Sequence, residues 1–162
     1  MRVMPIAYAY RDWNQMMRQV EASCLPTHNC NEAKTAAYAV AAAIRMALSG
    51  QSKQDIKEYI EDRYYDLSNP ISQIKRTHVF DSRASYSVPA SIQAFLESDD
   101  YESALRNAVS LGGDADTEAC IAGGIAEAFY HDIPQHISRF CDERLRGTVI
   151  KSIVKRFEEK YG

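Results

Sequence analysis

Residues 112–130 read GGDADTEACIAGGIAEAFY, and this stretch decides the predicted fold. After Thr117 nearly every residue is small or apolar, and two adjacent glycines, Gly123 and Gly124, stand inside the run. A glycine inside a helix costs about 1 kcal/mol relative to alanine. A helix accepts two of them where neighbouring helices must approach its backbone closely. The stretch therefore predicts a central, buried helix over about 118–130.

The rest of the chain also has the apolar periodicity of helices. Further helices are predicted over the ranges 31–50, 52–65, 89–98, 99–111, 134–147 and 148–161. No segment alternates strictly between apolar and polar residues, and no Asn-Gly or Asp-Gly hairpin turn is present. The sequence predicts an all-α fold, a compact orthogonal multi-helix domain around the central small-residue helix.

Local signals place several helix ends. Ser52 followed by Asp55 resembles a capping box, and Asp99 or Asp100 is the expected cap of the helix 99–111. Pro89 is expected in the first turn of the helix 89–98, since proline favours that position. The residues before it, 66–87, are rich in Ser and Asn and are expected to form a long loop.

Composition limits the class of protein. A chain of 162 residues suits one domain over residues 1–162. Its net charge of −3 argues against nucleic acid as a partner. No apolar run approaches the roughly 18 residues that a membrane span needs, and Pro5 and Asp12 interrupt any signal-peptide core. We expect a cytoplasmic protein that binds neither nucleic acid nor membrane.

The cysteines suggest free thiols. Cys24, His28 and Cys30 lie close together in sequence, but no fourth residue completes a zinc site at a suitable spacing. Cys120 stands among alanines and is expected to pack as a small hydrophobic residue.

The start of the central helix is open to two interpretations. Asp114, Asp116 and Thr117 supply three hard oxygen groups within four positions. One such residue caps a helix N-terminus. Two neighbouring carboxylates repel each other unless a cation lies between them, and oxygen ligands of this kind suit Mg²⁺ or Ca²⁺. An EF-hand is excluded, because Ala119 stands where its loop requires glycine. Chemistry alone leaves a capped helix and a metal site as equal alternatives.

The stretch AVSLGGDADTEACIAGGIAEAFY, residues 108–130, resembles the C-terminal metal motif of the ADP-ribosylglycohydrolases, Gly-Gly-Asp-x-Asp-Thr before a small-residue helix. Earlier segments are similar to the family in the same order. SVPASIQAFLES resembles the approach to that motif, ASCLPTHNCNEAKTAAYAVAAAIRMALSG the Thr-His segment, and MRVMPIAYAY the end of an Asn-Gly-Ser-Ala-Met-Arg stretch.

The resemblance implies a hydrolase that cleaves the glycosidic bond of ADP-ribose on a modified acceptor with two Mg²⁺ ions. It implies that Asp114, Asp116 and Thr117 are metal ligands and that His28 lies near bound ADP-ribose. The metals would hold ribose hydroxyls and polarise the attacking water. The expected partner is therefore an ADP-ribosylated substrate or ADP-ribose itself.

The family's Gly-Asp and Thr-Asp-Asp motifs have no counterpart in this sequence, so the chain is expected to correspond to the C-terminal half of the fold. Its catalytic acid remains unassigned. Half a fold would expose apolar helix faces, and we expect self-association or a complementary N-terminal chain to cover them. The alternative function is a non-catalytic helical remnant or binding module for ADP-ribose-like ligands or another chain.

Overall fold

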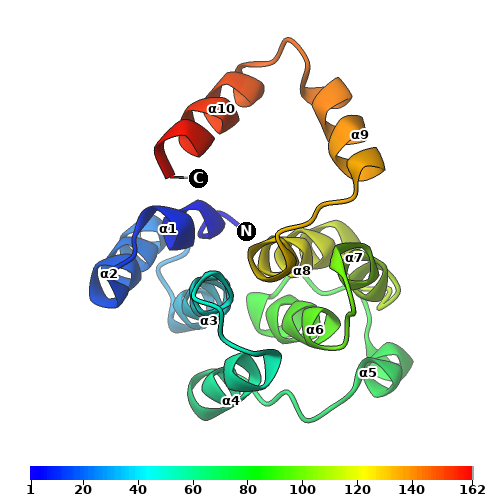
Figure 1. The fold of residues 1–162 in the computed structure, drawn as a ribbon. Coiled ribbons are helices and arrows are strands. Elements are labelled where there is room, and N and C mark those ends of the chain that lie inside the picture. The colour runs from blue at the N-terminus through cyan, green and yellow to red at the C-terminus, as the bar shows by residue number, and fades with distance from the viewer. Residues whose placement is uncertain (162) are drawn as a thin grey trace.

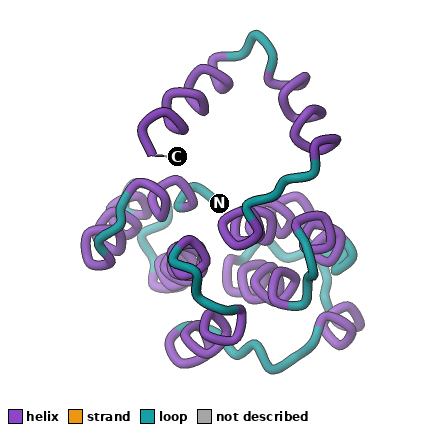
Figure 2. Tube along the Cα trace, in the orientation of Figure 1, coloured by secondary structure: helices purple, strands orange, loops and turns teal. Residues whose placement is uncertain are grey.

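The computed structural model describes residues 1–161, which form ten helices and no strand (Figures 1 and 2). The helices are α1 (Met4–Ala9), α2 (Trp13–Cys24), α3 (Asn31–Leu48), α4 (Lys53–Arg63), α5 (Ile71–Thr77), α6 (Ala84–Leu96), α7 (Tyr101–Val109), α8 (Ala115–Tyr130), α9 (Gln135–Leu145) and α10 (Val149–Tyr161). The all-α prediction is confirmed. None of these helices combines the length and apolarity needed to cross a bilayer.

Helix α8 is the central helix, as the small-residue run predicts. It packs against α3, α6 and α7 (Figure 1). A Cβ atom on Gly123 would lie 2.8 Å from Leu105 Cδ2, and one on Gly124 would lie 2.5 Å from Met4 Sδ. These distances are shorter than side-chain packing allows, so the two glycines let α7 and α1 approach the α8 backbone. Close packing of neighbouring helices therefore explains why this helix contains two glycines despite their low helix propensity.

Two of the predicted helix starts are confirmed with their caps. Ser52 and Asp55 form a reciprocal capping box at the start of α4. Asp100, rather than Asp99, caps α7, and its Oδ1 accepts a hydrogen bond from the Ser103 backbone N–H at 2.6 Å. Both caps are local in sequence, which is why the sequence reveals them.

The predicted long loop over 66–87 is wrong. Helix α5 lies within it, and α6 begins at Ala84, so Pro89 stands inside α6 and not in its first turn. The missing N–H of Pro89 would have paired with the carbonyl of Ser85, four residues earlier. Because Ser85 is exposed to solvent, water can satisfy that carbonyl and the helix tolerates the proline.

Both unexpected helix starts are capped by carboxylates from distant parts of the chain. Glu97, at the end of α6, accepts the backbone N–H of Ile71 at 2.8 Å. Glu32, in the first turn of α3, accepts the backbone N–H and the hydroxyl of Ser85 at 3.1 and 2.7 Å. A carboxylate at a helix N-terminus is stabilising wherever it comes from. No local sequence signal could announce these caps.

The prediction that Cys120 packs inside the protein is also wrong, since Cys120 is exposed. Helix α8 is enclosed by α3, α6 and α7 on its other sides. Cys120 lies on the remaining face, in line with Asp116 one turn earlier, which is exposed as well.

Helices α9 and α10 form a V-shaped arm set apart from the other eight helices, in which α9 leads away from α8 and α10 runs back toward the side of α1 in this view (Figures 1 and 2). Residues 131–134 connect the arm to α8, and His131 ends α8 in the left-handed conformation at φ 54°. No residue of either arm helix is buried. The hydrophobic core lies in α1–α8, with Phe95, Ile44 and Ile125 among its fully buried side chains.

The central position of α8 predicts the effect of a cavity there. Ile125→Ala should lower the free energy of unfolding by about 2–5 kcal/mol, because Ile125 is fully buried. Ile133→Ala is the matched control and should change it by less than about 0.5 kcal/mol, since Ile133 is exposed. Urea unfolding followed by circular dichroism measures both, and equal losses would contradict the central role of α8.

Candidate functional site

The candidate site is built on the turn that leads into α8. Gly112 has a φ of 81°, a conformation that glycine adopts without strain. Asp114 occupies the N-cap position, but its side chain accepts no hydrogen bond from the first turn of the helix. The capping role considered for Asp114 is therefore not what its side chain does in this structure.

The two aspartates lie against each other. A hydrogen bond from the Asp114 carboxyl group, which requires the proton to sit on Asp114, and the Thr117 backbone N–H hold the pKa of Asp116 below its ordinary value. That N–H donates to Asp116 Oδ1 at 2.9 Å. Asp114 is half-buried and Asp116 is exposed. Two adjacent carboxyl groups at a helix N-terminus form a locally negative position.

Beside this turn lies a cavity of about 500 Å³. Its wall comes from the N-terminal residues, the segment between α2 and α3, the start of α3, the segment before α6, and α8. The polar and charged side chains that line it include Arg2, His28, Glu32, Ser82, Arg83 and Thr117. A cavity of this size is in the range that holds small-molecule ligands.

The structure brings two of the predicted site residues to one cavity. Thr117 and His28 both line it, although 89 positions separate them in sequence. His28 Nδ1 lies 2.7 Å from Thr27 Oγ1 and 3.4 Å from Arg2 Nη2. Asp114 and Asp116 belong to the same turn as Thr117 but do not line the cavity.

A charged pair holds the segment before α6 in the cavity wall. Arg83 donates from Nε to both carboxylate oxygens of Asp81, at 3.0 and 2.9 Å. These hydrogen bonds lower the pKa of Asp81 to about 2. The Asp81 carboxylate therefore stays ionised at neutral pH and keeps Arg83 at the cavity.

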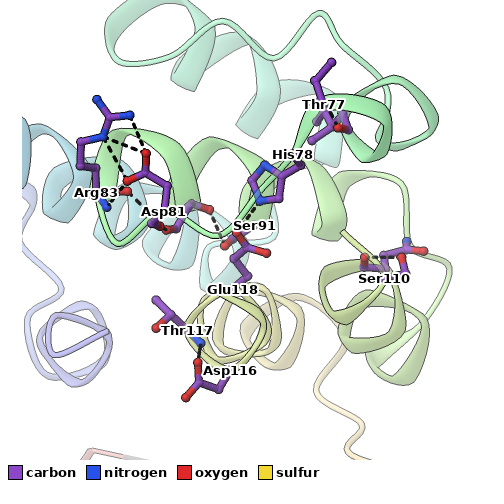
Figure 3. A network of polar contacts seen from close by, with 12 residues as sticks. Thr77, His78, Asp81, Arg83, Ser91, Ser110, Asp116, Thr117 and Glu118 are labelled. Atoms are coloured by element: carbon purple, nitrogen blue, oxygen red, sulfur yellow. Dashed lines mark hydrogen bonds and ion pairs between the residues drawn. The ribbon is translucent and has the colours of Figure 1, made fainter. Parts of the chain in front are cut away.

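The first turn of α8 carries another group, which sequence reasoning missed. Glu118 is fully buried, and its Oε1 lies 2.6 Å from His78 Nε2 (Figure 3). The His78 ring stacks on Tyr86, with ring centroids 5.1 Å apart. Figure 3 shows Glu118 directed toward His78 while Asp116 and Thr117 project on the other side of α8. The available signal was a glutamate, one of two with Glu127, in an otherwise small and apolar run.

Gly113 makes room for this buried pair. A Cβ atom at position 113 would lie 2.4 Å from His78 Nε2 and 2.7 Å from Glu118 Oε1. The second carboxylate oxygen of Glu118, Oε2, is buried and has no hydrogen-bond partner. The glycine turn, the histidine and the glutamate therefore fit together as one packed unit beneath the Asp114–Thr117 turn.

The donor set suits a hard cation only in part. Asp114, Asp116 and Thr117 can offer three oxygen atoms, whereas Mg²⁺ takes six ligands. Among residues 1–161, no group of three or more His, Cys, Asp and Glu side chains could hold a metal ion. The same finding leaves Cys24, His28 and Cys30 without support as a zinc site. Further Mg²⁺ ligands would have to come from water, a ligand or another chain.

Comparison with known proteins identifies the family. The ADP-ribosylglycohydrolase family profile matches residues 1–162. An uncharacterized protein of Archaeoglobus fulgidus is 30% identical over 151 residues, and the match covers 83% of this chain and 50% of that protein. A solved structure of an ADP-ribosylglycohydrolase-related protein complex superposes with a TM-score of 0.66 and 26% identity, over 80% of this chain and 49% of the other.

The chain therefore belongs to the ADP-ribosylglycohydrolase family. It spans about half the length of the two relatives described above. The motif GGDADT that suggested the family lies, in the structure, at the start of the central helix and beside the cavity.

Removing the partner of Glu118 should destabilise the fold. His78→Ala leaves a buried carboxylate without its hydrogen bond, and we expect a loss of about 1–3 kcal/mol in the free energy of unfolding. His136→Ala is the control, since the His136 side chain is 70% exposed, and it should change stability by less than about 0.5 kcal/mol. Thermal and urea unfolding measure the difference.

A double variant separates the hydrogen bond from the loss of the imidazole itself. Adding Glu118→Leu to His78→Ala removes the unpaired carboxylate, so the double variant should be more stable than His78→Ala alone. A double variant that loses the sum of both single effects would contradict a direct role for the pair.

Proposed function

We propose that this protein acts on ADP-ribose attached to a modified acceptor, hydrolysing the glycosidic bond with the help of Mg²⁺. The observation that carries the proposal is the position of the GGDADT turn, beside a cavity that Thr117 and His28 both line. Family membership supplies the class of reaction.

In this proposal Asp114, Asp116 and Thr117 hold Mg²⁺. When bound, the ion would orient ribose hydroxyls and act as a Lewis acid toward the attacking water. Arg2 and Arg83 line the cavity and carry positive charge, which suits the diphosphate of ADP-ribose. His28 lies on the same wall and would contact the ligand. The other side chains that line the cavity would bind and orient the ligand. We assign the role of catalytic acid to no residue of this chain.

The proposed activity depends on groups beyond this site. The described residues offer two adjacent carboxylates and no third acidic, histidine or cysteine ligand beside them. The relatives described above are about twice as long. We propose that a partner chain, either a second copy or a complementary N-terminal chain, completes the protein. The expected cytoplasmic location, without nucleic acid or membrane as a partner, stays a prediction.

The same observation favours a second candidate function. A helical module with the cavity but an incomplete set of metal ligands could bind ADP-ribose-like ligands, or another chain, without cleaving a bond. An assay with an ADP-ribosylated peptide separates the two functions. Binding of the peptide and release of free ADP-ribose are measured in the same experiment. Binding without release favours the module, and release that requires Mg²⁺ favours the hydrolase.

The metal role of the aspartates can be measured directly. Asp114→Asn and Asp116→Asn should each weaken Mg²⁺ binding about tenfold or more, because each removes a charged ligand worth at least about 1.4 kcal/mol. Asp132→Asn is the matched control, since Asp132 lies in the exposed segment after α8. Isothermal titration calorimetry reports the affinities. If the wild-type protein binds no Mg²⁺, the metal role is wrong and the two aspartates only begin the helix.

The cavity's role can be tested with ADP-ribose itself. His28→Ala should weaken ADP-ribose binding about fivefold, the effect of losing one hydrogen bond of about 1 kcal/mol. His136→Ala should leave the affinity unchanged, because His136 lies on α9, away from the cavity. Calorimetry or fluorescence titration measures both variants, and equal affinities would place the ligand elsewhere.

A further inference from the structure

The arm formed by α9 and α10 presents apolar side chains to solvent. Val149 is 71% exposed, Phe140 56%, Ile150 52% and Ile153 50%. Soluble proteins rarely keep a large contiguous apolar patch uncovered. The contacts of the arm with the other eight helices bury none of its residues. The arm therefore has a surface suited to a partner.

Helix α10 concentrates this surface in one stripe. Its apolar side chains recur with helical spacing, so they lie along one side of the helix. The members of the stripe are Val149, Ile150, Ile153, Val154, Phe157 and Tyr161. A stripe of this width is typical of a helix that packs against another amphipathic helix.

Charges beside the stripe indicate which partner fits. Lys151 and Glu158 are seven residues apart, so they lie on the same side of α10, two turns from each other. Both border the same edge of the apolar stripe. If two α10 helices pack antiparallel, Lys151 of one copy lies opposite Glu158 of the second copy. Opposite charges then flank this edge of the apolar contact at both of its ends.

Interactions within the arm leave this pairing available. Lys151 Nζ lies 2.8 Å from Asp142 Oδ1 of α9, but both side chains are about half exposed or more, so this contact contributes little. No salt bridge links Glu158 to another residue of the described chain.

We propose that the apolar stripe of α10 binds the α10 helix of a second copy in antiparallel orientation, so that the arm forms a homodimer. The interface is small, because a 13-residue helix is about 20 Å long. Phe140 on α9 adds to the apolar surface of the arm. A small interface predicts reversible, concentration-dependent association.

Sedimentation velocity tests the dimer on the full chain. Wild-type protein should shift from monomer to dimer between about 10 µM and about 1 mM, the range expected of a small interface. Ile153→Glu should abolish the shift by placing a charge in the stripe. Val109→Glu is the matched control on α7, because Val109 is 55% exposed and lies outside the arm, and it should dimerise as wild type does.

A charge exchange tests the orientation and the identity of the partner. Glu158→Lys should weaken dimerisation about fivefold or more, since it faces Lys151 of the second copy. The double variant Lys151→Glu with Glu158→Lys should recover most of that loss. Circular dichroism confirms that each variant is folded, which is expected because these side chains are exposed.

Three results would overturn the proposal. Wild-type protein could stay monomeric up to about 1 mM, which would indicate that another polypeptide covers the arm. Ile153→Glu could dimerise normally, which would place the interface elsewhere. The charge exchange could fail to restore a loss caused by Glu158→Lys, which would exclude the antiparallel pairing of α10 with itself.

Discussion

Close approach of neighbouring helices to the backbone of α8 is the constraint on which the structure depends. The side chains of Leu105 from α7 and Met4 from α1 occupy the space that a Cβ atom on Gly123 or Gly124 would need. The helix is therefore held on most of its sides, and its N-terminus is fixed within the protein body. The site inherits its position from this packing, because Asp114, Asp116 and Thr117 are the residues that begin α8.

The first turn of α8 serves two different surroundings. Thr117, with Ile121 one turn later, faces the cavity. Glu118, with Ala122 one turn later, faces a different side of the helix, toward His78 and the smaller apolar cluster that includes Ile71 and Ala94. The buried Glu118–His78 pair thus packs beneath the turn, while the oxygen groups of Asp114, Asp116 and Thr117 remain accessible to a ligand. Adjacent positions of one helix thus have different roles: Thr117 faces the proposed ligand cavity, and Glu118 packs in the interior.

The sequence predicted those features whose causes are local. The small-residue run identified α8, and Ser52 with Asp55 identified the start of α4. It failed for α5 and the start of α6, because their caps come from Glu97 and Glu32, many positions away.

The candidate site follows the same division. Asp114, Asp116 and Thr117 could be selected from their spacing and from the family motif. The partnership of Glu118 with His78 joins residues 40 positions apart through the folded chain, and no pattern in either segment predicts it. Cys120 was misplaced because composition does not reveal which face of a helix its neighbours leave uncovered.

Because adjacent residues in the first turn of α8 face the cavity and the interior, the structure limits which sequence changes this motif can tolerate during evolution. Successive helix residues are rotated by about 100°. Inserting or deleting one residue among 115–117 would turn Glu118 out of its buried position or carry Thr117 into the interior. A substitution in this turn changes one side chain, whereas an insertion or deletion changes which residues face the cavity and which face the interior. We therefore expect the distance along the chain from Gly113 to Glu118 to vary less among functional descendants than the residues between them.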